Sequence, residues 1–195
     1  MKLNLPNKLT LIRIVLVPVF MVAMIAPIFE SDVVSRLVAF GIFVVTSLTD
    51  MLDGKIARKY NLITNFGKFM DPLADKFMVF GALLAILVKY EYLRDVFVWA
   101  AAIVMFRELA VTSIRLVAAG QEHLVIAASW LGKVKTVSQV VCICTVILEP
   151  VVLPFKAFTE WHLLSYITIA FMVFMTLWSG IDYLKTYWKF IKPTE

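Results

Sequence analysis

The chain has 195 residues, of which 62% are hydrophobic and only 17% are charged, and its mean hydropathy is +0.88. Because an ordinary soluble domain carries about 45–50% apolar and about 25% charged residues, this composition excludes a large water-soluble domain. The formal net charge is a modest +5. We therefore expect a single membrane domain over residues 1–195.

The apolar residues fall into consecutive runs, each close to the roughly 20 residues that a helix needs to cross the hydrocarbon core. These runs are too long for barrel strands, and a backbone in lipid must satisfy its hydrogen bonds internally, which leaves helices. The expected fold class is all-α and integral to the membrane. Six transmembrane helices are predicted, at residues 11–29, 34–52, 73–90, 96–119, 124–148 and 161–188.

A short mixed segment precedes the first run. Between Leu3 and Arg13, apolar and polar side chains are interspersed, which is typical of a helix that lies at the membrane surface. Asn4 is a favourable N-cap residue, and Pro6 suits the first turn of a helix. We expect a short interfacial amphipathic helix before the first span.

The positions of Lys and Arg predict the orientation, since cytoplasmic loops carry an excess of both. With six spans, all of the 19 Lys and Arg residues except Arg36, Lys89, Arg94 and Lys156 fall on one side. That side also holds both termini. We expect a multi-pass protein of the cell membrane whose termini face the cytoplasm.

Four aspartates lie near the cytoplasmic ends of the second and third runs: Asp50, Asp53, Asp71 and Asp75. The first two are three residues apart and the last two are four apart, so each pair shares a helix face. Clustered carboxylates in an apolar setting repel one another unless cations neutralise them, and acids within membrane segments are functional candidates. Carboxylate oxygens suit hard divalent ions such as Mg²⁺ or Mn²⁺. We expect two such ions, which together could serve a phosphoryl displacement.

The spacing of the segment from Asp50 to Asp75, D-x2-D-G-x2-A-R-x8-G-x3-D-x3-D, resembles the motif of the CDP-alcohol phosphotransferases without a gap. The resemblance implies a membrane enzyme, active as a homodimer with an active site that faces the cytoplasm, in which the four aspartates hold the two metal ions. It implies that Asp75 also removes the proton of the acceptor hydroxyl. It further implies a CDP-binding site at Gly54, Ala57, Arg58 and Gly67.

A cluster of cations lies in the fourth and fifth runs. Cations within membrane segments should face a cavity rather than lipid, and several together fit an anion other than the CDP diphosphate, such as an acceptor that carries its own phosphate. The candidate phosphate-binding residues are Arg107, Arg115, Lys133 and Lys135. In the alternative interpretation, the lysines anchor a helix at the interface and Arg107 pairs with Glu108, although neighbouring helix residues point apart.

Two more runs, at residues 4–13 and 132–139, resemble the branch of the family that uses glycerol 3-phosphate. This resemblance implies CDP-diacylglycerol as the donor, with phosphatidylglycerol phosphate and CMP as products. It adds Asn7, Thr10, Thr136 and Gln139 as supporting residues.

Three alternatives stay open. Within the family, the acceptor could be phosphatidylglycerol, as in a cardiolipin synthase, or an inositol phosphate, as in a phosphatidylinositol phosphate synthase. A divalent-cation transporter is the alternative from another class, although the sequence lacks the internal repeat that many transporters show. No nucleic-acid partner is expected; the partners are the two substrates and membrane lipids.

Overall fold

The computed structural model describes residues 4–60, 62, 64–122, 129–153 and 155–191. Every regular element within these ranges is a helix, which confirms the all-α fold class. The long helices are α1 (Leu5–Ile25), α2 (Asp32–Lys59), α3 (Asn65–Lys89), α4 (Arg94–Glu122), α5 (Trp130–Val152) and α7 (Leu163–Ile191). Two short helices, η1 (Glu91–Leu93) and α6 (Lys156–Thr159), lie in the connections.

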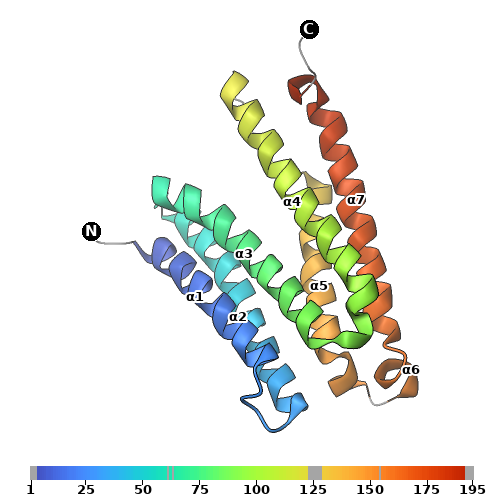
Figure 1. Cartoon of the computed structure of the whole chain (residues 1–195). Helices are drawn as coiled ribbons and strands as arrows, with labels where there is room; N and C mark the ends of the chain where they lie inside the picture. The colour runs from blue at the N-terminus through green and yellow to red at the C-terminus, as the bar shows by residue number, and fades with distance from the viewer. Residues whose placement is uncertain (1–3, 61, 63, 123–128, 154, 192–195) are drawn as a thin grey trace.

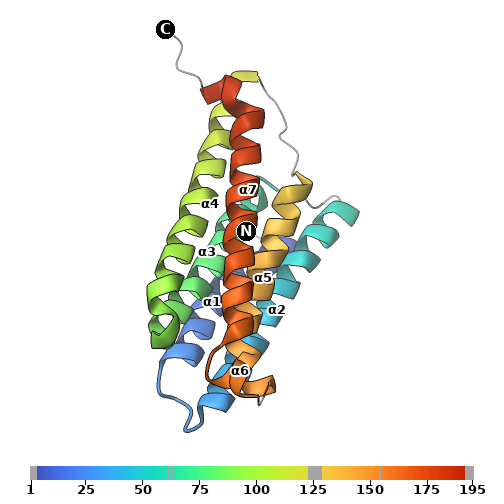
Figure 2. The same cartoon turned by 90° about the vertical axis from the view of Figure 1, so that its right-hand side faces the viewer.

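The long helices form two groups, which contact each other through α3 and α2. Helices α1, α2 and α3 pack together, and α7 packs against both α4 and α5 (Figures 1 and 2). Helix α3 contacts α4 and α5, and α2 contacts α5. Successive long helices run in opposite directions, so α1 begins and α7 ends at the same end of the bundle (Figure 1).

Helices long and apolar enough to cross a membrane make up most of the bundle. Among the described residues there are five such stretches: Leu5–Ile25, Asp32–Ala57, Glu91–Val117, Trp130–Val152 and Leu163–Trp188. Helix α3 is not one of them, because Lys68, Asp71, Asp75 and Lys76 lie within its first half and its longest uncharged stretch is residues 77–88. The chain is thus a multi-pass membrane protein by its helices, whereas the predicted sixth span is not confirmed.

The first helix does not divide into an interfacial part and a spanning part. Asn4 caps α1, since its side chain accepts a hydrogen bond of 3.1 Å from the backbone N–H of Asn7, and Pro6 lies in the first turn as expected. Beyond this cap the helix is continuous to Ile25, with Pro18 inside it. The predicted separate interfacial helix is therefore not confirmed, and its residues form the first turns of α1.

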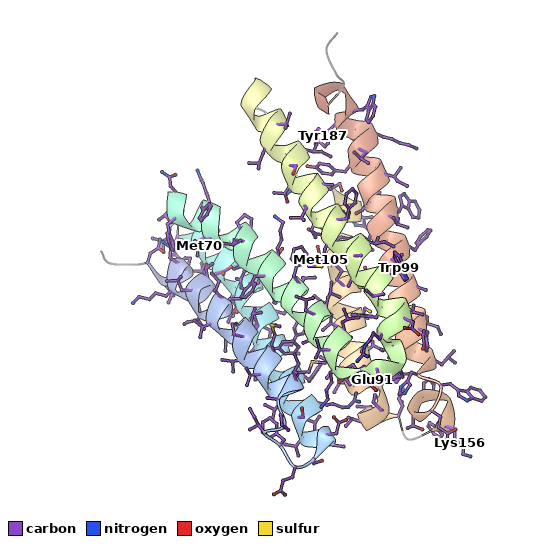
Figure 3. All side chains as sticks on the ribbon, in the orientation of Figure 1. Met70, Glu91, Trp99, Met105, Lys156 and Tyr187 are labelled. Carbon is purple, nitrogen blue, oxygen red and sulfur yellow. The ribbon has the colours of Figure 1, made fainter. Side chains whose placement is uncertain are left out.

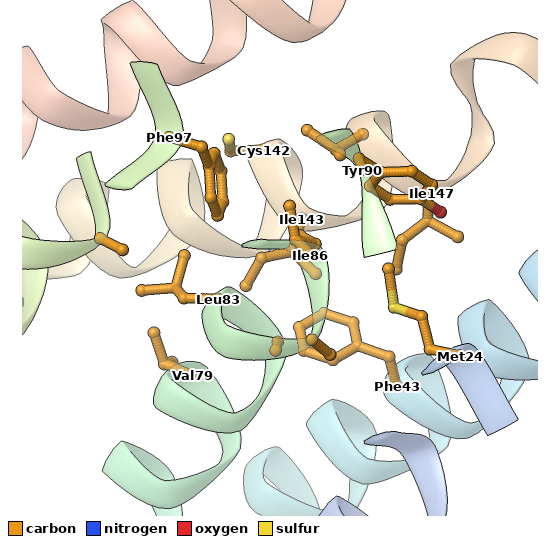
Figure 4. Packing of buried hydrophobic residues seen from close by; sticks show 14 of the residues in the cluster. Met24, Phe43, Val79, Leu83, Ile86, Tyr90, Phe97, Cys142, Ile143 and Ile147 are labelled. Carbon is orange, nitrogen blue, oxygen red and sulfur yellow. The ribbon is translucent and has the colours of Figure 1, made fainter. Parts of the chain in front are cut away.

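The core fixes α3 in the middle of the molecule. Leu83 and Ile86 of α3 are fully buried, beside Phe97 of α4 and Ile143 of α5 (Figure 4). Small residues let helices in a membrane approach closely, and Gly81 of α3 is such a residue. A Cβ atom there would lie 2.5 Å from Cγ1 of Val17 on α1. The close contact between α1 and α3 brings polar residues of α1 next to the aspartates of α3.

Candidate active site

The four aspartates lie on α2 and α3, near the end of the bundle where these two helices meet their connection. Met70, the residue before Asp71, marks this end in Figure 3, and Glu91 and Lys156 mark the opposite end. Thr64 caps α3 here, since its hydroxyl accepts a 3.0 Å hydrogen bond from the N–H of Gly67. The cap begins α3 early enough for its first two turns to carry Asp71.

A buried arginine lies between the two aspartates of α2. The side chain of Arg13, on α1, is 0% exposed, and its Nη1 lies 2.5 Å from Oδ1 of Asp50. Its Nη2 donates a short hydrogen bond to Oδ2 of Asp53. The sequence marked Arg13 only as part of the N-terminal run, and its contact with residues about 40 positions away was not predicted. The spacing of Asn7, Thr10 and Arg13, three residues apart, was the available signal, because it places them on one helix face.

The same face of α1 reaches the first turns of α3. The hydroxyl of Thr10 donates a 2.7 Å hydrogen bond to Oδ1 of Asp71. The side-chain oxygen of Asn7 accepts a 3.1 Å hydrogen bond from the Thr64 hydroxyl, and it lies 3.1 Å from where a Cβ of Gly67 would be. Asn7 and Thr10, predicted as supporting residues, thus contact the aspartate site directly or through the α3 cap.

Asp75 connects the aspartates to the cationic cluster. A pocket of about 400 Å³ lies between α3, α4 and α5 at this end of the molecule. It brings together the candidate base and every one of the four predicted phosphate-binding residues. The polar and charged residues that line it are Asp75, Lys76, Arg107, Glu108, Thr112, Arg115, Ser129, Lys133, Lys135 and Thr136.

Two cations of this pocket are engaged by one partly buried acid, Glu108. The ammonium of Lys135 donates a short hydrogen bond to Oε1 of Glu108. Nη1 of Arg107 lies 3.3 Å from the same oxygen, and its Nη2 donates a 2.7 Å hydrogen bond to Ser179. The argument that adjacent residues point too far apart for an Arg107–Glu108 pair was therefore wrong, because the long arginine side chain bends back to its neighbour.

Two further predicted cations lie in the lining, which also includes Lys76 of α3. Nε of Arg115 donates a 2.8 Å hydrogen bond to the hydroxyl of Tyr183 on α7, and the guanidinium lies 5.3 Å from the centroid of that ring. Lys133 is exposed within the pocket lining. The pocket therefore offers Arg115 and Lys133 to an anion in addition to the Lys135–Glu108 pair.

The remaining predicted residues are less closely tied to the site. Thr136 lines the pocket and bonds to the carbonyl of Gly132, whereas the buried Gln139 has no hydrogen-bond partner for Nε2 within the described residues. Gly54 and Ala57 are half-buried on α2 beyond Asp53. The side chain of Arg58 lies outside the described part of the chain. The CDP-binding set stays a prediction.

The donor chemistry at the aspartates fits a divalent cation. Asp53 interacts electrostatically with Asp50 and Asp71, and Asp75 interacts with Asp50, so the four carboxylates belong to one charged cluster. A cation, the guanidinium of Arg13, already bridges two of them. Within the described residues, no three His, Cys, Asp or Glu side chains are arranged to hold a metal ion.

Comparisons with known proteins show which family this sequence resembles. The model of the CDP-alcohol phosphatidyltransferase family matches residues 3–178. A Bacillus subtilis protein named CDP-diacylglycerol–glycerol-3-phosphate 3-phosphatidyltransferase is 41% identical, over 98% of this chain and 99% of its own. A Mycobacterium tuberculosis protein named probable phosphatidylglycerophosphate synthase is 37% identical, over 93% of this chain and 80% of its own. A Haemophilus influenzae protein with the same name as the Bacillus protein is 35% identical, over 95% and 94%.

Proposed function

This chain belongs to the CDP-alcohol phosphatidyltransferase family, and we propose that it transfers the phosphatidyl group of CDP-diacylglycerol to glycerol 3-phosphate. The products are phosphatidylglycerol phosphate and CMP. Relatives that carry the name of this reaction are 35–41% identical over nearly the whole chain. The chain is therefore an enzyme of phospholipid synthesis.

The observation that carries the acceptor assignment is the pocket that Asp75 shares with the four predicted phosphate-binding residues. Glycerol 3-phosphate carries a phosphate with up to two negative charges and a free hydroxyl. Arginine holds phosphate through paired hydrogen bonds and lysine holds it as a point charge. A phosphate at Arg107, Arg115, Lys133 and Lys135 would leave the hydroxyl end of the molecule free to reach Asp75.

The reaction requires proton transfer from the acceptor hydroxyl, attack of its oxygen on phosphorus, and departure of CMP. Asp75 accepts the proton of the acceptor hydroxyl as its oxygen attacks the β-phosphorus of CDP-diacylglycerol. The bond between that phosphorus and the bridging oxygen breaks, and CMP leaves with the electron pair. Since an alcohol is a poor nucleophile until its proton is removed, the placement of Asp75 in the acceptor pocket supports its role as the base.

Members of this family generally use divalent metal ions. Asp50, Asp53, Asp71 and Asp75 are the residues that would hold them, because carboxylates are the hard ligands in the described part of the site. When bound, such ions would polarise the diphosphate and stabilise the charge that develops on it. We infer that two such ions, Mg²⁺ or Mn²⁺, bind at these carboxylates.

We also propose that α3 is a sixth membrane crossing. Its 25 residues rise about 37 Å at 1.5 Å each, which is enough to span a bilayer. Helix α1 begins and α7 ends at the same end of the bundle (Figure 1), as an even number of crossings requires. The excess of Lys and Arg at that end supports a cytoplasmic position for the termini and the active site. The homodimer and the single domain over residues 1–195 stay predictions.

The proposed reaction is tested by identifying its lipid product. Purified protein in detergent micelles is supplied with CDP-diacylglycerol, Mg²⁺ and isotope-labelled glycerol 3-phosphate, and the lipid is analysed by mass spectrometry. The proposal expects labelled phosphatidylglycerol phosphate in a one-to-one ratio with CMP. Release of CMP without a labelled lipid would mean that water or another alcohol is the acceptor.

A further inference from the structure

We propose that Arg13 is a built-in counter-cation of the aspartate site, which neutralises Asp50 and Asp53 without metal and opposes the entry of a divalent ion. This inference rests on the metal site in the proposed function. It concerns what controls the loading of that site rather than what the metal does. It assigns to α1 a role that neither the motif on α2 and α3 nor the family match identifies.

The burial of Arg13 is the first observation. Its side chain is 0% exposed inside α1, a helix apolar enough to cross a membrane. A charged group in such a place needs a partner of opposite sign. Its partners in the described part of the chain are the carboxylates of Asp50 and Asp53, both of which are expected to be metal ligands.

The quality of these contacts is the second observation. Nη1 of Arg13 lies 2.5 Å from Asp50 but lacks hydrogen-bond geometry, and its Nε has no hydrogen-bond partner in the part of the chain that the structure describes. A guanidinium has five N–H donors, and a purely structural arginine in a protein interior usually has most of them satisfied. Arg13 is therefore held by charge more than by a complete set of hydrogen bonds.

Charge balance gives the third step. The site carries four carboxylates, at Asp50, Asp53, Asp71 and Asp75, and the guanidinium of Arg13 pairs with only the first two, so the site keeps an excess of negative charge. A guanidinium does not lose its proton in a protein. A divalent ion that approaches Asp50 and Asp53 must therefore displace Arg13 from at least one of them or bind beside a fixed positive charge.

The exposure of the two aspartates indicates where this exchange begins. The side chain of Asp50 is 41% exposed, whereas that of Asp53 is 6% exposed. An incoming ion meets Asp50 first, where the contact with Arg13 lacks hydrogen-bond geometry. Arg13 can keep its hydrogen bond to Asp53 while it releases Asp50. Arg13 is thus a positioning residue that sets how tightly the site holds its metal.

The test is a direct measurement of metal affinity, without turnover. Wild-type protein, Arg13→Gln and Arg13→Lys are freed of metal with a chelator, and Mn²⁺ binding is followed by electron paramagnetic resonance of the free ion. Arg13→Gln is expected to bind Mn²⁺ at least about tenfold more tightly, because a unit charge a few ångströms away strongly opposes a divalent ion in a protein interior. Arg13→Lys is expected to tighten binding less, since lysine keeps the charge but cannot bridge both carboxylates.

Arg36→Gln serves as the matched control. Like Arg13, Arg36 is a buried arginine that pairs with an aspartate of α2, in this case Asp32. Arg36 itself lies near the start of α2, far along the helix from Asp50. Its substitution should leave Mn²⁺ affinity unchanged. The melting temperature without metal should fall in Arg13→Gln, and Mn²⁺ should raise it by more than in the wild type.

The outcomes separate this inference from the proposed function. Unchanged or weaker Mn²⁺ binding in Arg13→Gln, with normal binding by the wild type, overturns the counter-cation role and leaves the metal site intact. If Arg13→Gln does not fold, Arg13→Lys decides in the same way. A wild-type protein that binds no Mn²⁺ overturns both the inference and the metal site on which it rests.

Discussion

The hydroxyl of Thr10 donates a 2.7 Å hydrogen bond to Oδ1 of Asp71 and so joins the first helix to a candidate metal ligand 61 residues away. The bond occupies one carboxylate oxygen and leaves the other, Oδ2, to face Gly67. Thr10 is fully buried. Asp71 is therefore oriented by a side chain outside the aspartate motif.

Thr10→Val should weaken metal use. Valine keeps the shape of threonine and removes only the donor, and a hydrogen bond to a charged group contributes about 1.5–3 kcal/mol. We expect the Mg²⁺ concentration for half-maximal activity to rise about tenfold, in the opposite direction to the effect of Arg13→Gln on binding. Thr46→Val, which removes a hydroxyl that bonds to Ile42 in its own helix, is the control. An unchanged metal requirement in Thr10→Val would contradict this role.

Asp75→Asn should abolish turnover. Asparagine is nearly isosteric but cannot accept a proton, and loss of a general base costs about 100- to 10,000-fold in rate. Turnover is measured as CMP release at saturating substrates, with the melting temperature as the check on folding. Asp95→Asn, at the start of α4 near the opposite end of the bundle, should keep full activity. Near-normal turnover in Asp75→Asn would reject Asp75 as the base.

Lys135→Ala should affect the acceptor more than the donor. Lys135 lines the pocket of Asp75 and pairs with Glu108, so its loss removes one cation and leaves a partly buried carboxylate, paired only with Arg107, that repels phosphate. We expect the KM for glycerol 3-phosphate to rise about tenfold or more, since one charge-assisted hydrogen bond is lost, with little change for CDP-diacylglycerol. The exposed Lys156, at the far end, supplies the control Lys156→Ala. An equal rise in both KM values would favour a general anchoring role for Lys135.

Gly81→Ala should destabilise the protein without touching the site chemistry. The added methyl would lie 2.5 Å from Cγ1 of Val17, and overpacking in a core costs about 1–3 kcal/mol. The melting temperature in detergent is expected to fall. Gly41→Ala is a matched control, because a Cβ at Gly41 would meet nothing within 4 Å. Equal melting temperatures for the two variants would show that α1 and α3 are not closely packed at this point.

The sequence predicted the helical fold better than the helix ends. The apolar run at 34–52 marked the second helix, yet α2 continues to Lys59, and the run at 73–90 marked the third, although α3 begins at Asn65. Hydropathy reports the thickness of the membrane, whereas a helix extends past it as long as its backbone bonds and caps are satisfied. Asp53 and Asp71 lie in these polar extensions, whereas Asp50 and Asp75 lie within the predicted runs.

Contacts between residues on different helices could not be predicted from the sequence pattern. Arg107 and Arg115 are eight residues apart, so helix periodicity alone places them on one face of α4, and both line the pocket. The place of Arg13 between Asp50 and Asp53 depends on how α1 packs against α2, which no local pattern encodes. The pairing of Glu108 with both Lys135 and Arg107 likewise follows from the approach of α4 to α5 and from side-chain flexibility.

The most direct test of the proposed acceptor compares alcohols in one assay. CMP release from CDP-diacylglycerol is measured with glycerol 3-phosphate, glycerol or phosphatidylglycerol as the acceptor, for the wild type and Lys135→Ala. We predict release with glycerol 3-phosphate, little with glycerol or phosphatidylglycerol, and a loss in Lys135→Ala that high glycerol 3-phosphate restores. Release with phosphatidylglycerol and none with glycerol 3-phosphate would contradict the phosphate-binding pocket and identify a lipid acceptor.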